Sequence, residues 1–349
     1  MNERIEAVDI GRGLAVMVMV CVHVMWMYAS VDTQGSTWLG HLLHTLGKGT
    51  AAFLLFMGMS LQLARHKSTS EHLIRSVQLI ALGYLMNALK FLLPLHAGVL
   101  PEAFIQAYGW QAPLSVGQQL YLLSTGDILQ LAGLTLALYA LLQCVITSAL
   151  HWCVVGIVIA LMTPWLRQWI DAEHYVLKLF AGHDYQVYFP MLPWASFIFF
   201  GAALGQWWRQ SPQQCVRALP WIGGLSMALG FALYRYDAAL HMGNFFHHGP
   251  GGTLYLLGIT LLALWLIQCS VRWHYPDALM SAWRYCSQRV TSLYVIQWVL
   301  VCWGMGIVGF QTQGVAGTLL LIIPAWAATL AVQWLYDQQK ERLWRWRTA

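Results

Sequence analysis

Apolar stretches of about 20 residues recur about ten times in this 349-residue chain, and they decide what it can fold into. A helix of that length spans the hydrocarbon core of a bilayer, where an open sheet could not satisfy its backbone hydrogen bonds. The sequence therefore predicts an all-α fold: one polytopic membrane bundle over residues 1–349, with about 10 transmembrane helices. The predicted spans are 7–29, 45–63, 73–93, 122–146, 150–166, 189–208, 218–236, 252–271, 290–310 and 315–336.

The composition and the loop charges agree with a multi-pass membrane protein. Charged residues make up 9% of the chain and hydrophobic residues 58%, whereas a soluble domain has about 25% charged residues. Most Lys and Arg residues fall in the loops on one side of the predicted membrane, which predicts that both termini are cytoplasmic. The net charge of +5 follows from this topology, so no nucleic acid is expected as a partner.

Three ionisable residues lie in the first predicted span. Arg12 and His23 are eleven positions apart, which brings them to the same face of a helix, roughly 16 Å apart along its axis. Asp9 falls near the same face, one turn before Arg12. Because an ionisable side chain is costly inside a bilayer, such a stripe is a functional-site hypothesis by default, although Asp9 and Arg12 could also pair at the interface.

Further candidates lie near the predicted outer ends of the helices. His44 and Lys48 are four residues apart and share a face at the entry to the second span, directly after the helix that carries His23. The stretch 95–121 is too long for a simple connector, and we expect Tyr108 and Trp110 there to stack on a sugar ring. Asp127, early in the fourth span, is a further candidate for contact with the substrate.

A metal site is not expected from the spacing of the histidines. The pairs His41/His44 and His247/His248 could ligate zinc, but a catalytic zinc site needs three protein ligands and a structural one needs four. Acidic residues in the outer loops are few, and the sequence contains no His-Glu-x-x-His string.

Several motifs resemble a known superfamily. Arg12 and His23, with ten residues between them, resemble the Arg-x10-His motif of the type-3 membrane acyltransferases. The string VDIGRGLAVMVMVCVH resembles the first helix of the bacterial heparan-alpha-glucosaminide N-acetyltransferase-like family in the same transmembrane acyltransferase superfamily. Residues 51–61, 125–134, 188–205 and 289–297 are similar to other stretches of that family. Asp127 departs from the family pattern, where a neutral residue is expected.

The resemblance implies an enzyme of the bacterial cytoplasmic (inner) membrane that modifies glycans. Such an acetyltransferase moves an acyl group, acetyl in that family, from cytoplasmic acyl-coenzyme A to a sugar or glycan of the cell envelope at the outer face. His23 is then expected as general base or nucleophile, with Asp9 orienting Arg12 and His44 as a further catalytic candidate. The residues expected to bind the coenzyme A phosphates are Arg12, Lys48, Arg65, Lys67 and Arg75. Membrane lipid is another expected partner, and a homodimer is left open.

One alternative comes from a different functional class. The stripe could be the relay or substrate path of a proton-coupled transporter or exporter that uses Asp9, Arg12, His23, Lys48 and Asp127. A transporter should release no free thiol from acyl-coenzyme A, whereas an acyltransferase should. A third hypothesis is a non-catalytic membrane partner within a polysaccharide assembly system, in which His23 would be dispensable.

Overall fold

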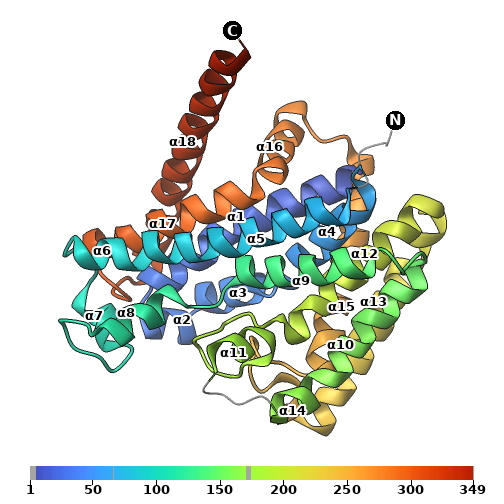
Figure 1. Ribbon diagram of the computed structural model, residues 1–349, viewed down its shortest axis with the longest axis horizontal. Coiled ribbons are helices and arrows are strands. Elements are labelled where there is room, and N and C mark those ends of the chain that lie inside the picture. The colour runs from blue at the N-terminus through green and yellow to red at the C-terminus, as the bar shows by residue number, and fades with distance from the viewer. Residues whose placement is uncertain (1–4, 66, 170–173, 349) are drawn as a thin grey trace. The chain divides into compact units, whose positions relative to one another are not determined.

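The computed structural model describes residues 5–65, 67–169 and 174–348, and these residues are almost entirely helical (Figure 1). Eight helical spans in this part of the chain are long and apolar enough to cross a membrane. The predicted all-α polytopic membrane fold is therefore confirmed. The eight spans are Glu6–Tyr28, Trp38–Leu63, Thr69–His96, Ala149–Trp169, Pro212–Tyr236, Pro250–Trp273, Val290–Val308 and Val315–Arg342.

The predicted span at 122–146 is replaced by two shorter helices. α8 (Val116–Leu123) ends at the second residue of that span, and α9 (Ile128–Leu142) begins only after an extended turn. In that turn the Gly126 N–H donates to the Gln186 carbonyl at 2.7 Å, and the Gly126 carbonyl accepts from the Tyr188 N–H at 3.0 Å. Any side chain on Gly126 would collide with Val187, so the glycine permits this pairing of backbones.

The chain divides into two compact units, and the first contains Met1–Gly11, Gly49–Leu85 and Ser124–Pro276. α12 is its central helix, with most of its residues buried. It packs against α4, α9 and α10. The complete helices of this unit are α4 (Thr50–Leu63), α9, α10 (Ala149–Trp169), α11 (Tyr175–Ala181), α12 (Met191–Gln210), α13 (Pro212–Tyr236), α14 (Ala238–Met242), α15 (Pro250–Ser270) and η2 (Val271–Trp273).

Glycines allow the helices of this unit to approach closely. A β-carbon at Gly58 of α4 would overlap the Ile198 carbonyl of α12, and one at Gly201 of α12 would overlap the Leu55 carbonyl of α4. α13 and α15 approach in the same way at Gly258 of α15, where a β-carbon would lie 2.5 Å from the Met227 nitrogen of α13. Small residues are the usual means of close helix packing in membranes, where lipid is as apolar as the side chains.

The second unit contains Arg12–Lys48, Met86–Leu123 and Asp277–Ala349. α1 (Glu6–Tyr28) begins in the first unit and continues into this one, and α5 (Thr69–Asn87) ends in it. In Figure 1 the last helix, α18, is the single long dark red helix. The complete elements are α2 (Val31–Ser36), α3 (Trp38–Gly47), η1 (Ala88–Leu92), α6 (Leu93–His96), α7 (Glu102–Gln106), α8, α16 (Asp277–Gln288), α17 (Val290–Val308) and α18 (Val315–Thr348).

The end of α1 is fastened to α17 and to the segment that follows it. The Tyr28 hydroxyl donates to the Val301 carbonyl at 2.9 Å. The Met27 and Tyr28 carbonyls accept from the Gln311 and Gln313 N–H groups at 2.9 and 2.8 Å. These bonds fix the C-terminal half of α1 against α17, and His23 lies in that half.

Candidate active site

His23 lies on α1 and is buried, with 6% of its surface exposed. Its Nδ1 atom lies 2.9 Å from Oε1 and 2.7 Å from Nε2 of Gln297 on α17. Gln297 is itself 1% exposed, and its Nε2 also donates to the Tyr294 carbonyl at 3.2 Å. If Oε1 accepts from Nδ1–H, the lone pair of the imidazole is on Nε2, which is the form that a general base needs.

Aromatic rings hold the imidazole in place. Trp298 stacks on it, with ring centroids 3.7 Å apart and an interplanar angle of 23°. Tyr294 meets it edge-on at 6.2 Å, and Trp26 is tilted against it at 5.8 Å. With one ring nitrogen bonded and one face stacked, His23 has a fixed orientation, as a catalytic histidine requires.

Lys90 also belongs to this site, and the sequence did not lead us to predict it. It is 2% exposed, and its Nζ lies 4.6 Å from the centroid of Trp298 and 4.8 Å from that of Phe91. A cation over an aromatic face is attracted by the ring, which offsets part of the cost of its burial. Lys90 therefore contacts Trp298, the same ring that stacks on His23.

The π-helical turn η1 places Lys90 at this position. Pro94 follows four residues later, and a proline cannot donate to the carbonyl of residue i−4, which shifts the hydrogen-bond register. The Trp303 indole N–H donates to the Leu89 carbonyl within the same turn at 3.0 Å. A lysine one turn before a proline in an otherwise apolar span is the sequence signal that could have identified it.

Asp9 and Arg12 lie on the same unbroken helix as His23. The spacing of roughly 16 Å along the axis between Arg12 and His23 therefore holds. Asp9 is buried and Arg12 is half-buried. α1 thus carries ionisable groups in its first turns and, with His23, near its C-terminal end.

His44 and Lys48 do not lie on the face of α3 that packs against α1. α3 turns Leu39 and Leu43 toward the cluster that contains Met25 of α1, while His44 is exposed. Lys48 is the C-terminal cap of α3 and is half-buried. In place of one helix over 45–63, the structure has a helix that begins at residue 38, a break at Lys48 and then α4. The catalytic role of His44 and the phosphate role of Lys48 stay predictions.

Three further predicted phosphate-binding residues lie in the first unit. Arg65, Lys67 and Arg75 are exposed near the connection from α4 to α5. Their position is compatible with an anion that arrives from solvent.

Tyr108 and Trp110, predicted to bind the acceptor, are brought together in the second unit. Their rings stack at 4.8 Å with an interplanar angle of 20°, and Tyr121 meets Trp110 edge-on at 5.3 Å. Trp110 also lines a hollow of about 390 Å³ with Glu102 and Gln106. An aromatic ring beside a carboxylate and an amide is a suitable surface for a sugar.

Asp127 has a structural role in the first unit. It caps α9: its Oδ1 accepts from the Ile128 N–H at 2.7 Å, and the Gln130 side chain accepts from the Asp127 N–H at 3.2 Å. The spacing Asp-x-x-Gln is a capping-box signature that was readable in the sequence. Its predicted contact with the substrate stays a prediction.

Comparison with known proteins identifies a family. The family model described as "Heparan-alpha-glucosaminide N-acetyltransferase, catalytic" matches residues 4–229. The matched region includes Asp9, Arg12, His23 and Lys90, whereas Gln297 lies beyond it. No curated protein matches the chain. Among the described residues, no group of three His, Cys, Asp or Glu side chains could hold a metal ion.

Proposed function

Because the chain belongs to the heparan-alpha-glucosaminide N-acetyltransferase family, we propose that it transfers an acetyl group from acetyl-coenzyme A to a sugar or glycan of the cell envelope. It is a multi-pass membrane protein with an acetyltransferase-type catalytic region. We place it in the bacterial cytoplasmic membrane, with the donor on the cytoplasmic side. The observation that carries the proposal is the buried pair of His23 and Gln297.

In the proposed reaction His23 acts as general base at Nε2. It takes the proton of an acceptor hydroxyl or amine, whose oxygen or nitrogen then attacks the thioester carbonyl carbon. The carbon–sulfur bond breaks, and the leaving thiolate of coenzyme A takes the proton from His23, which restores the neutral imidazole. The variant of this reaction in which His23 is first acetylated and then passes the acetyl group to the acceptor uses the same residue as nucleophile.

Charged residues would bind the phosphates of the donor. Arg12 and the exposed basic residues Arg65, Lys67 and Arg75 supply guanidinium and ammonium groups, which form charge-assisted hydrogen bonds with phosphate oxygens. Asp9 would orient Arg12, and Tyr108 and Trp110 would receive the sugar.

The experiment that tests this proposal measures free thiol released from acetyl-coenzyme A by the purified full chain, with and without pooled envelope sugars. Release that depends on the acceptor supports acetyl transfer. If the protein neither binds nor turns over acetyl-coenzyme A, the proposal fails and the proton-coupled transporter becomes the better hypothesis. Exchange of label between coenzyme A and acetyl-coenzyme A without acceptor would identify the acyl-histidine variant.

We expect two substitutions of Gln297 to behave differently. Gln297→Glu keeps an oxygen that accepts from Nδ1–H and should retain most of the activity, whereas Gln297→Leu should lower kcat about tenfold or more with little change in KM. A purely structural role would instead lower the yield of folded protein for both variants. Loss of activity only in the glutamate variant would show that Gln297 donates to Nδ1, which places the imidazole hydrogen on Nε2.

Trp110→Ala should weaken acceptor binding. Removal of the ring that lines the hollow and stacks on Tyr108 is expected to raise the KM for the acceptor about tenfold while kcat stays nearly unchanged, because stacking stabilises ground state and transition state alike. The measurement is steady-state kinetics at saturating acetyl-coenzyme A. Trp221→Ala, at an exposed position of α13, is the matched control, and an equal effect there would refute the assignment.

A further inference from the structure

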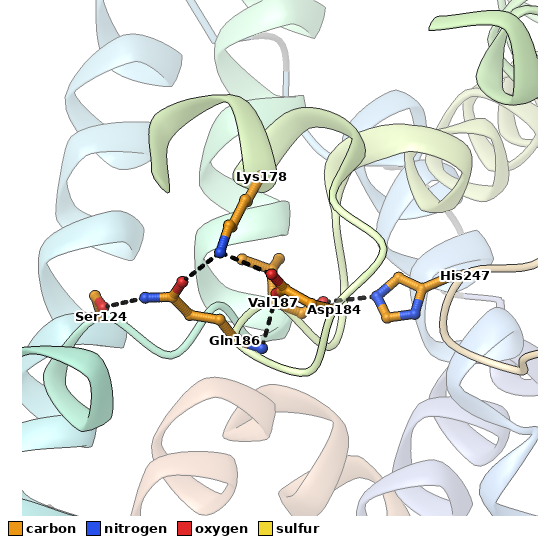
Figure 2. Close-up of polar contacts among 6 residues, drawn as sticks. All are labelled: Ser124, Lys178, Asp184, Gln186, Val187 and His247. Atoms are coloured by element: carbon orange, nitrogen blue, oxygen red, sulfur yellow. Dashed lines mark hydrogen bonds and ion pairs between the residues drawn. The ribbon is translucent and has the colours of Figure 1, made fainter. Parts of the chain in front are cut away.

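Two adjacent histidines of the first unit are buried in the turn between α14 and α15. His247 is 7% exposed and His248 is 1% exposed. His247 Nε2 bonds to the Val187 carbonyl at 2.9 Å, as Figure 2 shows, and His248 Nδ1 bonds to the Phe245 carbonyl at 2.8 Å. Because a carbonyl oxygen only accepts, these two nitrogens carry the hydrogen. In the neutral rings His247 Nδ1 and His248 Nε2 are therefore acceptors.

Both rings are neutral near pH 7. Burial lowers the pKa of His247. The hydrogen bond to Val187 and the charge of Asp184 act against this shift, whereas the charges of Arg167 and His183 add to it. Burial also lowers the pKa of His248 to about 4; the bond to Phe245 opposes this shift, and the charges of Arg167 and His247 add to it. The acceptor nitrogens, His247 Nδ1 and His248 Nε2, are buried and have no hydrogen-bond partner among the residues that the structure describes.

Arg167, in the last turn of α10, brings a positive charge to the same place. Its Nη1 donates to the His247 carbonyl at 2.7 Å, and its charge is felt by both imidazoles. Its Nε and Nη2 atoms are buried and have no partner within the described ranges. A guanidinium is always charged, and its two buried nitrogens lose contact with water without gaining a partner among the described residues. The arrangement therefore favours an anion at these nitrogens.

The donors and acceptors together select the kind of anion. The Nε and Nη2 edge of a guanidinium fits two oxygens of a carboxylate or phosphate, and the positive charge disfavours a metal ion at the histidines. A carboxylate or sulfate has no hydrogen near neutral pH to donate to the imidazole acceptors. A phosphate monoester has a second pKa of about 6, so it carries a P–OH group in part of its population.

We propose that Arg167, His247 and His248 bind the phosphate group of a phosphate monoester. Arg167 Nε and Nη2 donate to the P–O⁻ oxygens, and the single hydrogen of the P–OH group is donated to one of the two acceptors, His247 Nδ1 or His248 Nε2. The proposal does not depend on acetyl transfer. The phosphate can belong to a soluble compound or to a lipid headgroup, and its binding chemistry is the same.

The first arm of the test is isothermal titration of the purified full chain near pH 7 with inorganic phosphate, with glycerol 3-phosphate and with sulfate. Both phosphates should bind at least about tenfold more tightly than sulfate, which has the same shape but no hydrogen. Equal binding of sulfate would overturn the role of the histidines. The second arm compares nanodiscs that contain phosphatidic acid, a monoester, with nanodiscs that contain phosphatidylglycerol, a diester.

Retention of phosphatidic acid without binding of the soluble phosphates assigns the site to a lipid headgroup. Binding of glycerol 3-phosphate assigns it to a soluble ligand. Binding of none of these compounds refutes the proposal. These readouts use no acetyl donor, so failure here is separate from failure of the proposed enzyme activity.

Substitutions localise the binding. Arg167→Gln should weaken phosphate binding about tenfold to 100-fold, but it also removes the bond to the His247 carbonyl. Two histidine variants keep the bonds to the backbone: His248→Asn retains a donor at the Nδ1 position, and His247→Gln retains one at the Nε2 position. The variant that removes the accepting nitrogen should weaken phosphate binding at least about tenfold, and both variants should keep the melting temperature without phosphate close to wild type. Unchanged phosphate binding in the two folded variants would refute the site.

Discussion

His23→Ala is expected to lower kcat for acetyl transfer by about 10²-fold to 10⁴-fold, the usual contribution of a general base. The KM for acetyl-coenzyme A should change little, because the imidazole takes up the acceptor's proton in the transition state and does not bind the donor. His23→Gln should be as inactive as the alanine variant, since an amide of similar length is not a base. The measurement is thiol release at saturating donor and acceptor.

The matched control is another buried histidine. His72 on α5 is as buried as His23, and its ring meets Tyr139 edge-on at 5.4 Å. His72→Ala should leave turnover per folded protein near wild type, although removal of a packed ring costs stability. Undiminished turnover by a folded His23→Ala protein would instead show that the base lies elsewhere, and it would favour a non-catalytic membrane partner.

The second large effect concerns the contact between α4 and α12. Gly58→Ala should lower the free energy of unfolding by about 3 kcal/mol or more, because the new methyl group would overlap the Ile198 carbonyl and meet the Ala202 nitrogen at 2.9 Å. These are backbone atoms, so no side chain can rotate away to make room. The measurement is the thermal melting temperature of the detergent-solubilised chain, together with its yield as a monodisperse peak.

Gly224→Ala supplies the same chemical change without the collision. A β-carbon at Gly224 of α13 meets no atom within 4 Å outside its own helix. Alanine is the better helix former, so this variant should be as stable as wild type or slightly more stable. If the Gly58→Ala protein had the same melting temperature as the Gly224→Ala protein, this would contradict the close packing of α4 on α12.

The difference between α8/α9 and the predicted helix at 122–146 shows where a hydropathy pattern stops being sufficient. The run from 122 to 146 is apolar enough for one helix, but the backbone of Gly126 pairs with that of Gln186 and Tyr188, and Asp127 caps α9. The capping signal was present in the sequence, whereas the partner segment lies some 60 residues away and carries no comparable pattern. Local signals locate a possible break, and tertiary pairing decides whether it occurs.

The sequence by itself determined that this protein is a bundle of membrane helices and that Asp9, Arg12 and His23 share one of them, because hydropathy and helical spacing are local properties of the chain. Only the tertiary structure decided what surrounds His23. Gln297 is 274 positions away, and Lys90 comes from a third segment. Such contacts depend on which faces of distant helices pack together, and that choice is made by shape and small residues over the whole bundle.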